Sequence, residues 1–325
     1  MASAPDRQDG CPLCGAQTRR RLVTKMGFDV VRCTACGLVY VWPPPGADEL
    51  EALYSGGDYH AVVDEGERRR TFARRLRQIE AICPERGRLL DVGCSKGFFL
   101  GVARDAGWDV AGVELNRNAA DEARGRGLDV RHGDLAAARF DEASFDVVTL
   151  FDVIEHTSRP RDTLAACRRV LRPDGMLVAT TPDVGGLVPR VTYALFACTL
   201  GAWDHPTPPG HLVQFSRRTL RQLLESEKFA AIAERSEHIP MAYSVGKLEN
   251  SVLDVLAGRH RRRPERVVRA HTGAESGAQR PRSSPLRCLP RLGVRGAAWL
   301  VIGLAGLLAR ATRWGDSRWV AARQA

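Results

Sequence analysis

The sequence predicts an α/β fold, in which a doubly wound and mostly parallel Rossmann-like sheet is preceded by a small zinc ribbon with four cysteine ligands. Between residues 88 and 180, short apolar segments alternate with helical segments. This alternation is typical of a parallel sheet that is covered by helices on both faces. Upstream, residues 11–36 contain four cysteines in two Cys-x-x-Cys pairs. A chain of 325 residues is long enough for both parts.

The two cysteine pairs predict a structural zinc site. Cys11 and Cys14 are separated by 18 residues from Cys33 and Cys36. This spacing matches the two knuckles of a tetrahedral site with four thiolate ligands. The sequence begins without an apolar leader segment, so we expect a cytoplasmic protein whose thiols stay reduced. We therefore expect Zn²⁺ at these cysteines rather than disulfides.

The elements follow in a regular order. A proline-rich linker at residues 43–46 precedes residues 48–82, which predict helix. The expected strands of the sheet are residues 88–92, 109–113, 128–131, 145–151 and 176–180. Three helices are expected between these strands. The first follows the turn after residue 92 and ends near residue 106, and the other two cover residues 119–126 and 160–171. Residues 183–213 predict an inserted lid, and Ser216 is the expected N-cap of a helix that ends at Ser226.

Two further strands are expected to close the sheet by about residue 245. The predicted organisation is a zinc ribbon at 1–42, a linker and helical segment at 43–84, a sheet domain at 85–245 and a basic tail at 246–325. The tail carries most of the charge, because fifteen arginines stand against three acids between Arg259 and Arg323. The net charge of this segment is +12 and that of the whole chain is +10, so the rest of the chain carries about −2 and is close to neutral.

The tail also contains an apolar run at residues 296–309, between Arg295 and Arg310. A fourteen-residue helix is too short to span a bilayer but can lie in its interface, where the arginines would contact anionic lipid. This predicts a peripheral position at the inner face of a membrane. A core or dimer helix is the alternative.

Polar and small residues gather where the predicted strands end. The first strand ends in a turn that contains Asp91, Gly93, Cys94 and Gly97. Small residues there let the backbone approach a ligand, and an acid suits a cofactor with an ammonium group, such as S-adenosylmethionine. A tight turn without a ligand is the alternative. Glu114 ends the second strand, where a carboxylate can accept hydrogen bonds from ribose hydroxyls.

Three more segments complete the pattern. Asp134, with Leu135 beside it, follows the third strand, and an Asp there can meet an adenine amino group. Asp152 begins the run to His156 after the fourth strand, and Leu171–Gly175 leads into the fifth. We expect all of these residues at the carboxyl edge of the sheet, where open α/β sheets bind ligands.

Together these motifs resemble the class I S-adenosylmethionine-dependent methyltransferases, and most of all the branch that includes the ubiquinone-type O-methyltransferases. The resemblance covers about half of the chain and implies that Asp91 and Gly93 lie by the methionine end of the cofactor. Glu114 would then bind the ribose and Asp134 the adenine. Ser95 and Asp174 depart from the family pattern, which usually has Gly at both turns. A zinc ribbon precedes many methyltransferases of this branch.

His156 and His211 are the candidate bases, because an imidazole can take the proton of a hydroxyl as the methyl group moves. A structural role is the alternative for each, and His205 is a weaker candidate in the lid. The expected reaction is methylation, mainly on oxygen, of a small-molecule, sugar or lipid-linked glycan acceptor. An RNA methyltransferase and a non-catalytic adaptor that binds S-adenosylmethionine are the rival hypotheses. The near-neutral core makes nucleic acid the weaker partner.

Overall fold

The computed structural model describes residues 10–25, 27–46, 50, 65–194, 208–237, 304 and 315–325. The chain divides into two compact units. One unit contains residues 1–53, 182–220 and 235–318, and the other contains residues 54–181, 221–234 and 319–325. Each unit is therefore assembled from three separate segments of the sequence.

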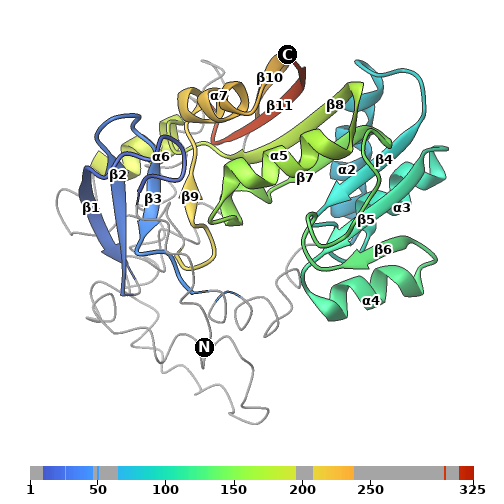
Figure 1. Cartoon of the computed structure of the whole chain (residues 1–325), viewed down its shortest axis with the longest axis horizontal. Coiled ribbons are helices and arrows are strands. Elements are labelled where there is room, and N and C mark those ends of the chain that lie inside the picture. Colours follow the sequence, from blue (N-terminus) through green and yellow to red (C-terminus); the bar gives the residue numbers. More distant parts are fainter. Residues whose placement is uncertain are drawn as a thin grey trace, which may run out of the picture. The chain divides into compact units, whose positions relative to one another are not determined.

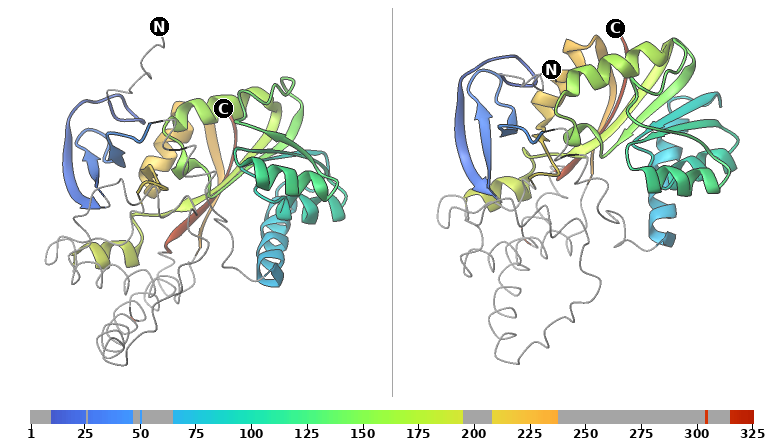
Figure 2. Two further views of the ribbon diagram at one scale, coloured as in Figure 1. Left: turned by 90° about the horizontal axis from the view of Figure 1, so that it is seen from below. Right: turned by 60° about the horizontal axis from the view of Figure 1, so that its bottom comes forward.

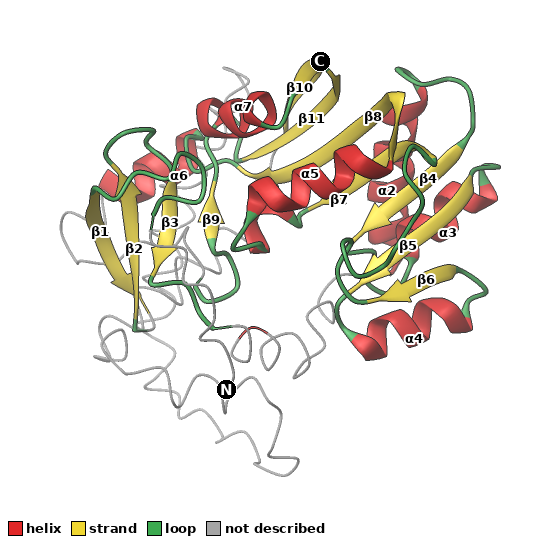
Figure 3. Ribbon diagram, viewed as in Figure 1, coloured by secondary structure: helices red, strands yellow, loops and turns green. Residues whose placement is uncertain are grey.

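The larger sheet has seven strands in the order β10-β11-β8-β7-β4-β5-β6 (Figures 1 and 3). Their bounds are β4 Arg88–Val92, β5 Asp109–Glu114, β6 Asp129–His132, β7 Phe145–Phe151, β8 Leu171–Pro182, β10 Phe229–Glu237 and β11 Ser317–Gln324. The pairs from β6 through β5, β4 and β7 to β8 are all parallel. The helices are α2 Glu65–Glu80, α3 Phe98–Asp105, α4 Arg117–Gly125, α5 Pro160–Val170 and α7 Arg217–Ser226. The predicted fold class is confirmed.

Apolar side chains explain why these segments pack together. The core between sheet and helices includes Ile79 of α2, Leu89 of β4, Phe99 and Leu100 of α3 and Trp319 of β11, all at most 1% exposed. Strand order reverses at β4, since β5 lies on one side of it and β7 on the other. Such a switch point opens a crevice beyond the carboxyl ends of the strands.

The smaller sheet has four strands in the order β1-β2-β3-β9. Their bounds are β1 Arg19–Lys25, β2 Phe28–Cys33, β3 Val39–Trp42 and β9 Val213–Gln214. All three pairs are antiparallel. Val23, Val30 and Val39 form the core of one face, against which Val184 and Tyr193 pack. The cysteine-rich hairpin thus shares its sheet with a strand from residues 213–214, just after the segment expected to be a lid.

Two expectations need correction. The sheet does not close by residue 245, because β11 is built from residues 317–324 and lies between β8 and β10 (Figure 2). Leu171–Gly175 does not lie at the carboxyl edge, because Leu171 begins β8 and pairs with Phe145 at the start of β7. In a parallel sheet, the starts of neighbouring strands share the amino edge. The other domain boundaries remain predictions.

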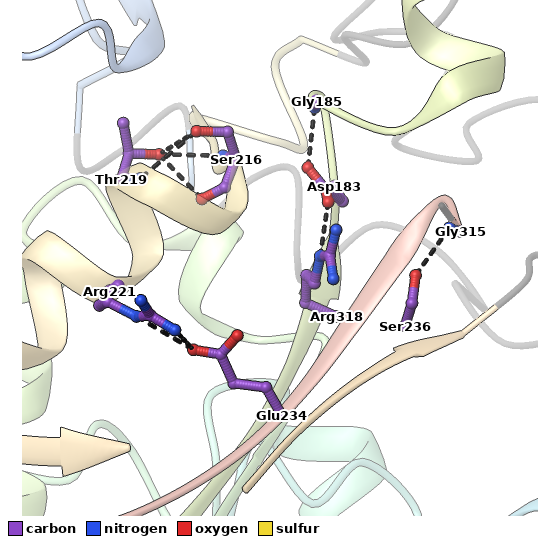
Figure 4. A network of polar contacts seen from close by, with 9 residues as sticks. All are labelled: Asp183, Gly185, Ser216, Thr219, Arg221, Glu234, Ser236, Gly315 and Arg318. Carbon is purple, nitrogen blue, oxygen red and sulfur yellow. Dashed lines mark hydrogen bonds and ion pairs between the residues drawn. The ribbon is translucent and has the colours of Figure 1, made fainter. Parts of the chain in front are cut away.

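Polar contacts fix the segments around β11 (Figure 4). The Asp183 carboxylate accepts hydrogen bonds from Arg318 Nε at 2.6 Å and from the Gly185 amide at 2.8 Å. The Gly315 amide donates to Ser236 Oγ at 2.6 Å. Asp183 is 1% exposed, so its charge is stabilised mainly by these partners. The chain on either side of β11 is thereby tied to β10 and to the end of β8.

At the start of α7, the Thr219 amide donates to Ser216 Oγ at 3.3 Å, which confirms Ser216 as the N-cap. Residues 195–207 of the expected lid and residues 238–303 and 305–314 of the tail lie outside the described residues. Of the apolar run at 296–309 only Leu304 is described, and its side chain is exposed. No helix in the described part of the chain is both long and apolar enough to cross a membrane.

Candidate functional site

The turn after β4 has a backbone that only small residues allow. Gly93 and Gly97 have φ angles of +72° and +75°. A Cβ at Gly93 would lie 2.6 Å from a methyl group of Val153, and one at Gly97 would lie 2.4 Å from Leu128. Ser95, between them, also has a positive φ, of 51°, a conformation that glycine adopts without strain. This is one of the two positions at which the sequence departs from the family pattern; the other is Asp174.

Glu114, the last residue of β5, is held by this turn. Its two carboxylate oxygens accept hydrogen bonds from the Ser95 amide at 2.8 Å and the Asn116 amide at 2.7 Å. An ionised carboxylate can accept about four hydrogen bonds, so each oxygen can still accept one from a hydroxyl. The two amides thus hold the carboxylate in one orientation and leave it able to accept further hydrogen bonds. Leu115, the next residue, is 57% exposed and presents an apolar surface beside it.

Asp91 lies deeper in the sheet and is 4% exposed. The Thr149 hydroxyl on β7 donates to its Oδ1 at 2.6 Å. Burial raises the pKa of Asp91 to about 7, and the nearby Glu114 charge adds to this, whereas the Thr149 bond and the Arg75 charge oppose it. A cationic ligand group at this carboxylate would favour its ionised form. Cys94 is also buried, and burial raises the pKa of its thiol well above the ordinary range.

Asp134 and Leu135 follow β6 and have different environments. Asp134 is exposed, and its Oδ1 accepts a hydrogen bond from the Ala137 amide at 2.6 Å. Leu135 is buried. The Gly133 amide donates to the Glu114 carbonyl at 2.9 Å, so the turn that carries Asp134 is joined to the end of β5. Asp134 and Glu114 therefore belong to the same edge of the sheet.

Asp152, after β7, is engaged by other protein groups. Its carboxylate accepts hydrogen bonds from Thr180 Oγ1 at 3.0 Å and from Arg75 Nη2 at 3.1 Å. Arg75 comes from α2, is largely buried, and lies 4.7 Å from the ring centroid of Phe151. Arg75 is not among the site residues that the sequence predicts. Its spacing from Phe72 and Ile79 on the apolar stripe of α2 was the available signal.

Glu155 and His156 lie in the short helix η1, Ile154–His156. Glu155 is 2% exposed, and burial together with the Asp152 charge raises its pKa well above the ordinary range, against the opposing Thr181 and Arg75. His156 is partly buried, and its amide donates to the Val153 carbonyl at 2.9 Å. His211 is partly buried in the other compact unit. His205 lies outside the described residues. The assignment of a base therefore remains a prediction.

The four predicted zinc ligands form one cluster, with all four sulfur atoms within 4.8 Å of one another. Cys11 Sγ lies 3.6 Å from Cys36 Sγ, and Cys14 Sγ lies 3.6 Å from Cys33 Sγ. Four sulfurs at about 2.3 Å from a tetrahedral zinc would be about 3.8 Å apart. The spacing and the donor set therefore fit Zn²⁺.

The loops around these thiols have matching backbone bonds. The Gly15 amide donates to the Cys11 carbonyl, and the Gly37 amide donates to the Cys33 carbonyl. Burial raises the pKa of the Cys33 thiol, but hydrogen bonds from the amides of Cys36 and Ala35 and from the side chains of Cys14 and Cys36 together lower it to about 7. Burial raises the pKa of the Cys36 thiol to about 11, and that of Cys11 further. Amides that stabilise a thiolate favour a sulfur that coordinates a cation.

Comparisons with known proteins show the family of the chain. The family model described as "Methyltransferase domain" matches residues 65–234, just over half of the chain. The chain therefore belongs to this methyltransferase family, and the predicted enzyme class is confirmed at that level. The match covers α2, β4 to β8 and α7, and with them the turn that holds Glu114.

A probable S-adenosylmethionine-dependent methyltransferase of Mycolicibacterium smegmatis is 32% identical over 143 residues, which are 43% of this chain and 51% of that protein. A ubiquinone biosynthesis O-methyltransferase of Roseobacter denitrificans is 35% identical over 100 residues, 29% of this chain and 40% of that protein. The chain thus spans about half of the length of the first relative and less of the second. A crystal structure of a SAM dependent methyltransferase from Archaeoglobus fulgidus is 17% identical, with a TM-score of 0.49 over 82% of this chain and 100% of that one.

Proposed function

We propose that this protein transfers a methyl group from S-adenosylmethionine to an oxygen of a small-molecule, sugar or lipid-linked glycan acceptor. The observation that carries the proposal is the Glu114 carboxylate, which two backbone amides hold at the end of β5. Membership of the methyltransferase family supports the donor, and the O-methyltransferase relatives favour oxygen as the accepting atom.

Different residues would bind different parts of S-adenosylmethionine. The Glu114 oxygens would accept hydrogen bonds from the two ribose hydroxyls, and the exposed Leu115 would lie against the flat adenine ring. Asp134 would accept a hydrogen bond from the adenine amino group. Asp91 would pair with the ammonium group of the methionine end, which stabilises its ionised form. Catalysis would rest on holding the acceptor in line with the methyl group.

The proton of the acceptor hydroxyl has to leave as the new carbon–oxygen bond forms. We propose His156 or His211 as the group that takes it, because a neutral imidazole can accept a proton near pH 7. S-adenosylmethionine supplies the electrophilic methyl group when it is bound. The residues of the chain would bind the donor, orient the acceptor and exclude water.

The test is calorimetry of S-adenosylmethionine binding to Glu114→Ala. We expect affinity to fall at least about tenfold, or about 1.4 kcal/mol, because two charge-assisted hydrogen bonds are lost. Glu142→Ala, which removes an exposed carboxylate, is the matched control and should bind like the wild type. Thermal melting must show that both variants are folded. Unchanged affinity in a folded Glu114→Ala protein would contradict the assignment.

An acceptor screen with labelled donor separates the rival functions. Label on a small molecule or glycan supports the proposal, and label on RNA would replace it with the RNA methyltransferase hypothesis. Donor binding without turnover on any acceptor would favour a non-catalytic adaptor. Contact of the segment from Arg259 to Arg323 with an anionic membrane remains a prediction, since most of that segment lies outside the described residues.

We further propose that Cys11, Cys14, Cys33 and Cys36 hold one structural Zn²⁺. The sulfur distances and the amide contacts to the thiols support this. Val23, Val30 and Val39 form a small core on one face of this sheet, and a metal bound by the four cysteines would add stability to it.

A further inference from the structure

Two arginines of the cysteine-rich hairpin face each other across neighbouring strands. Arg20 of β1 and Arg32 of β2 are directly opposite in the antiparallel pairing. Side chains at such positions have Cβ atoms about 4.5–5.5 Å apart, and like charges there destabilise a sheet. Both side chains are exposed. The sequence thus maintains a repulsive pair at a place where many neutral residues would fit.

Neither charge is compensated by another residue that the structure describes. Throughout the described part of the chain, the guanidinium groups of Arg20 and Arg32 have no hydrogen-bond or ion-pair partner. The hairpin from Arg19 to Cys33 contains five basic residues and one acid, Asp29. Asp29 is already engaged, because its carboxylate accepts a hydrogen bond from Thr24 Oγ1 at 2.6 Å and lies 4.0 Å from Arg21.

A pair of hydroxyl groups stands next to the arginines. Thr18 and Thr34 lie just outside β1 and β2, two positions from Arg20 and Arg32. The hydrogen bond from the Thr34 amide to the Thr18 carbonyl continues the strand pairing, in which positions two apart share a face. Thr34 Oγ1 donates to Thr18 Oγ1 at 2.6 Å, and the Thr34 amide donates to the Thr18 carbonyl at 3.2 Å. The Thr18 hydroxyl hydrogen can then point outward. The three groups offered to a ligand are two guanidinium forks and one hydroxyl, all of which donate hydrogen bonds.

We propose that Arg20, Arg32 and Thr18 form a binding site for a phosphate or diphosphate group carried by a small ligand. A guanidinium fork matches the geometry of phosphate oxygens, and two forks offset a dianion. The site lies on the zinc-ribbon hairpin and does not depend on the methyl-transfer reaction. A bound phosphate would attract both guanidinium groups and so offset the repulsion between them.

The proposal predicts opposite effects of one substitution with and without ligand. Without ligand, Arg20→Gln should melt at the same or a higher temperature than the wild type, because the like-charge pair is gone. In calorimetry with inorganic pyrophosphate, Arg20→Gln and Arg32→Gln should each bind at least about tenfold more weakly. Arg70→Gln is the matched control, since Arg70 is an exposed arginine of α2. It should bind within about twofold of the wild type.

Titrations at constant ionic strength decide between a site and general attraction. Equal weakening in Arg70→Gln, or unchanged binding in the Arg20→Gln/Arg32→Gln double variant, would overturn the proposal. Vesicles with an anionic phospholipid test the source of the phosphate. Vesicle binding that pyrophosphate competes away supports a site that recognises the phosphate itself. Vesicle binding that the double variant loses but that pyrophosphate does not reduce in the wild type would refute it, because the two arginines would then recognise negative charge in general.

Discussion

Asp91 and Glu114 could be placed from the sequence because each stands at the end of an apolar strand, and strand ends of a parallel sheet share one edge. Arg75, Thr149 and Leu115 could not be placed in the same way. Arg75 reaches Asp152 across 77 positions of the sequence, and Thr149 reaches Asp91 across 58. Such contacts depend on how α2 and β7 pack, which no local pattern encodes.

Asp91 makes a testable link between pH and stability. Its folded-state pKa is raised to about 7, so its contribution to stability is full below about pH 4 and is lost as the pH rises through 7. An Asn at position 91 cannot ionise, so Asp91→Asn should not lose stability as the pH rises. The stability that the wild type loses is roughly 1.4 kcal/mol for each unit by which the pKa of Asp91 is raised. We expect the variant to gain stability over the wild type progressively between pH 4 and 7, and the gain to be constant above. Denaturant unfolding at a series of pH values measures this.

Binding by the wild type should show the converse dependence. S-adenosylmethionine affinity should fall as the pH drops below about 7, because an ammonium group binds the ionised carboxylate. Asp91→Asn should bind weakly at every pH. Asp129→Asn, at the exposed start of β6, is the control for losing one carboxylate. A stability difference that does not vary with pH would show that Asp91 titrates normally.

At the scale of elements, local pattern located the middle of most helices and strands. The predicted strand at residues 145–151 coincides with β7, and the predicted strand at residues 176–180 lies within the longer β8. Its first residues, Leu171–Asp174, include a proline and a turn signal, so the start of β8 could not be read from alternation. The two-residue β9 is too short for any periodic signal and exists because β3 offers an edge to pair with.

The prediction at the scale of elements concerns the metal content of the cysteine-rich hairpin. We expect metal analysis of the purified protein to find one zinc per chain, and Cys33→Ser to lose it, because a tetrahedral site needs all four thiolates. Loss of the metal should also lower the melting temperature. Cys83→Ser, which alters a thiol outside the cluster, should retain full zinc. Stoichiometric zinc in Cys33→Ser would show that the ligand set is wrong.

At the scale of the whole molecule, the alternation of strands and helices was enough to predict the parallel part of the sheet. The position of β11 was not predictable in this way. Residues 317–324 follow a long basic segment and contain only four consecutive apolar residues, 319–322, and the strand enters the sheet between β8 and β10. The segment after residue 245, which was predicted to be a tail, therefore contains an interior strand of the sheet.

Trp319 tests this placement, because its side chain is fully buried in the core of the larger sheet. Trp319→Ala should lower the free energy of unfolding by about 3–5 kcal/mol, as expected for a large buried aromatic residue. Arg323→Ala changes an exposed residue of the same strand and should have little effect. Denaturant titration of both variants is the measurement. Equal stability of Trp319→Ala and the wild type would mean that β11 is an appendage.

The place of β11 in the sheet also has a consequence during translation. β10 ends at Glu237 and its neighbour β11 begins at Ser317, so the ribosome has to add roughly 80 residues before the two can pair. At typical synthesis rates this takes about 4–16 s. During that time the nascent chain carries β8 with one unpaired edge, which is open to pairing with other chains. Chains whose translation ends before residue 317 would lack β11 and keep this edge of β8 unpaired. Such truncated chains should therefore be the main source of aggregates when this protein is overproduced.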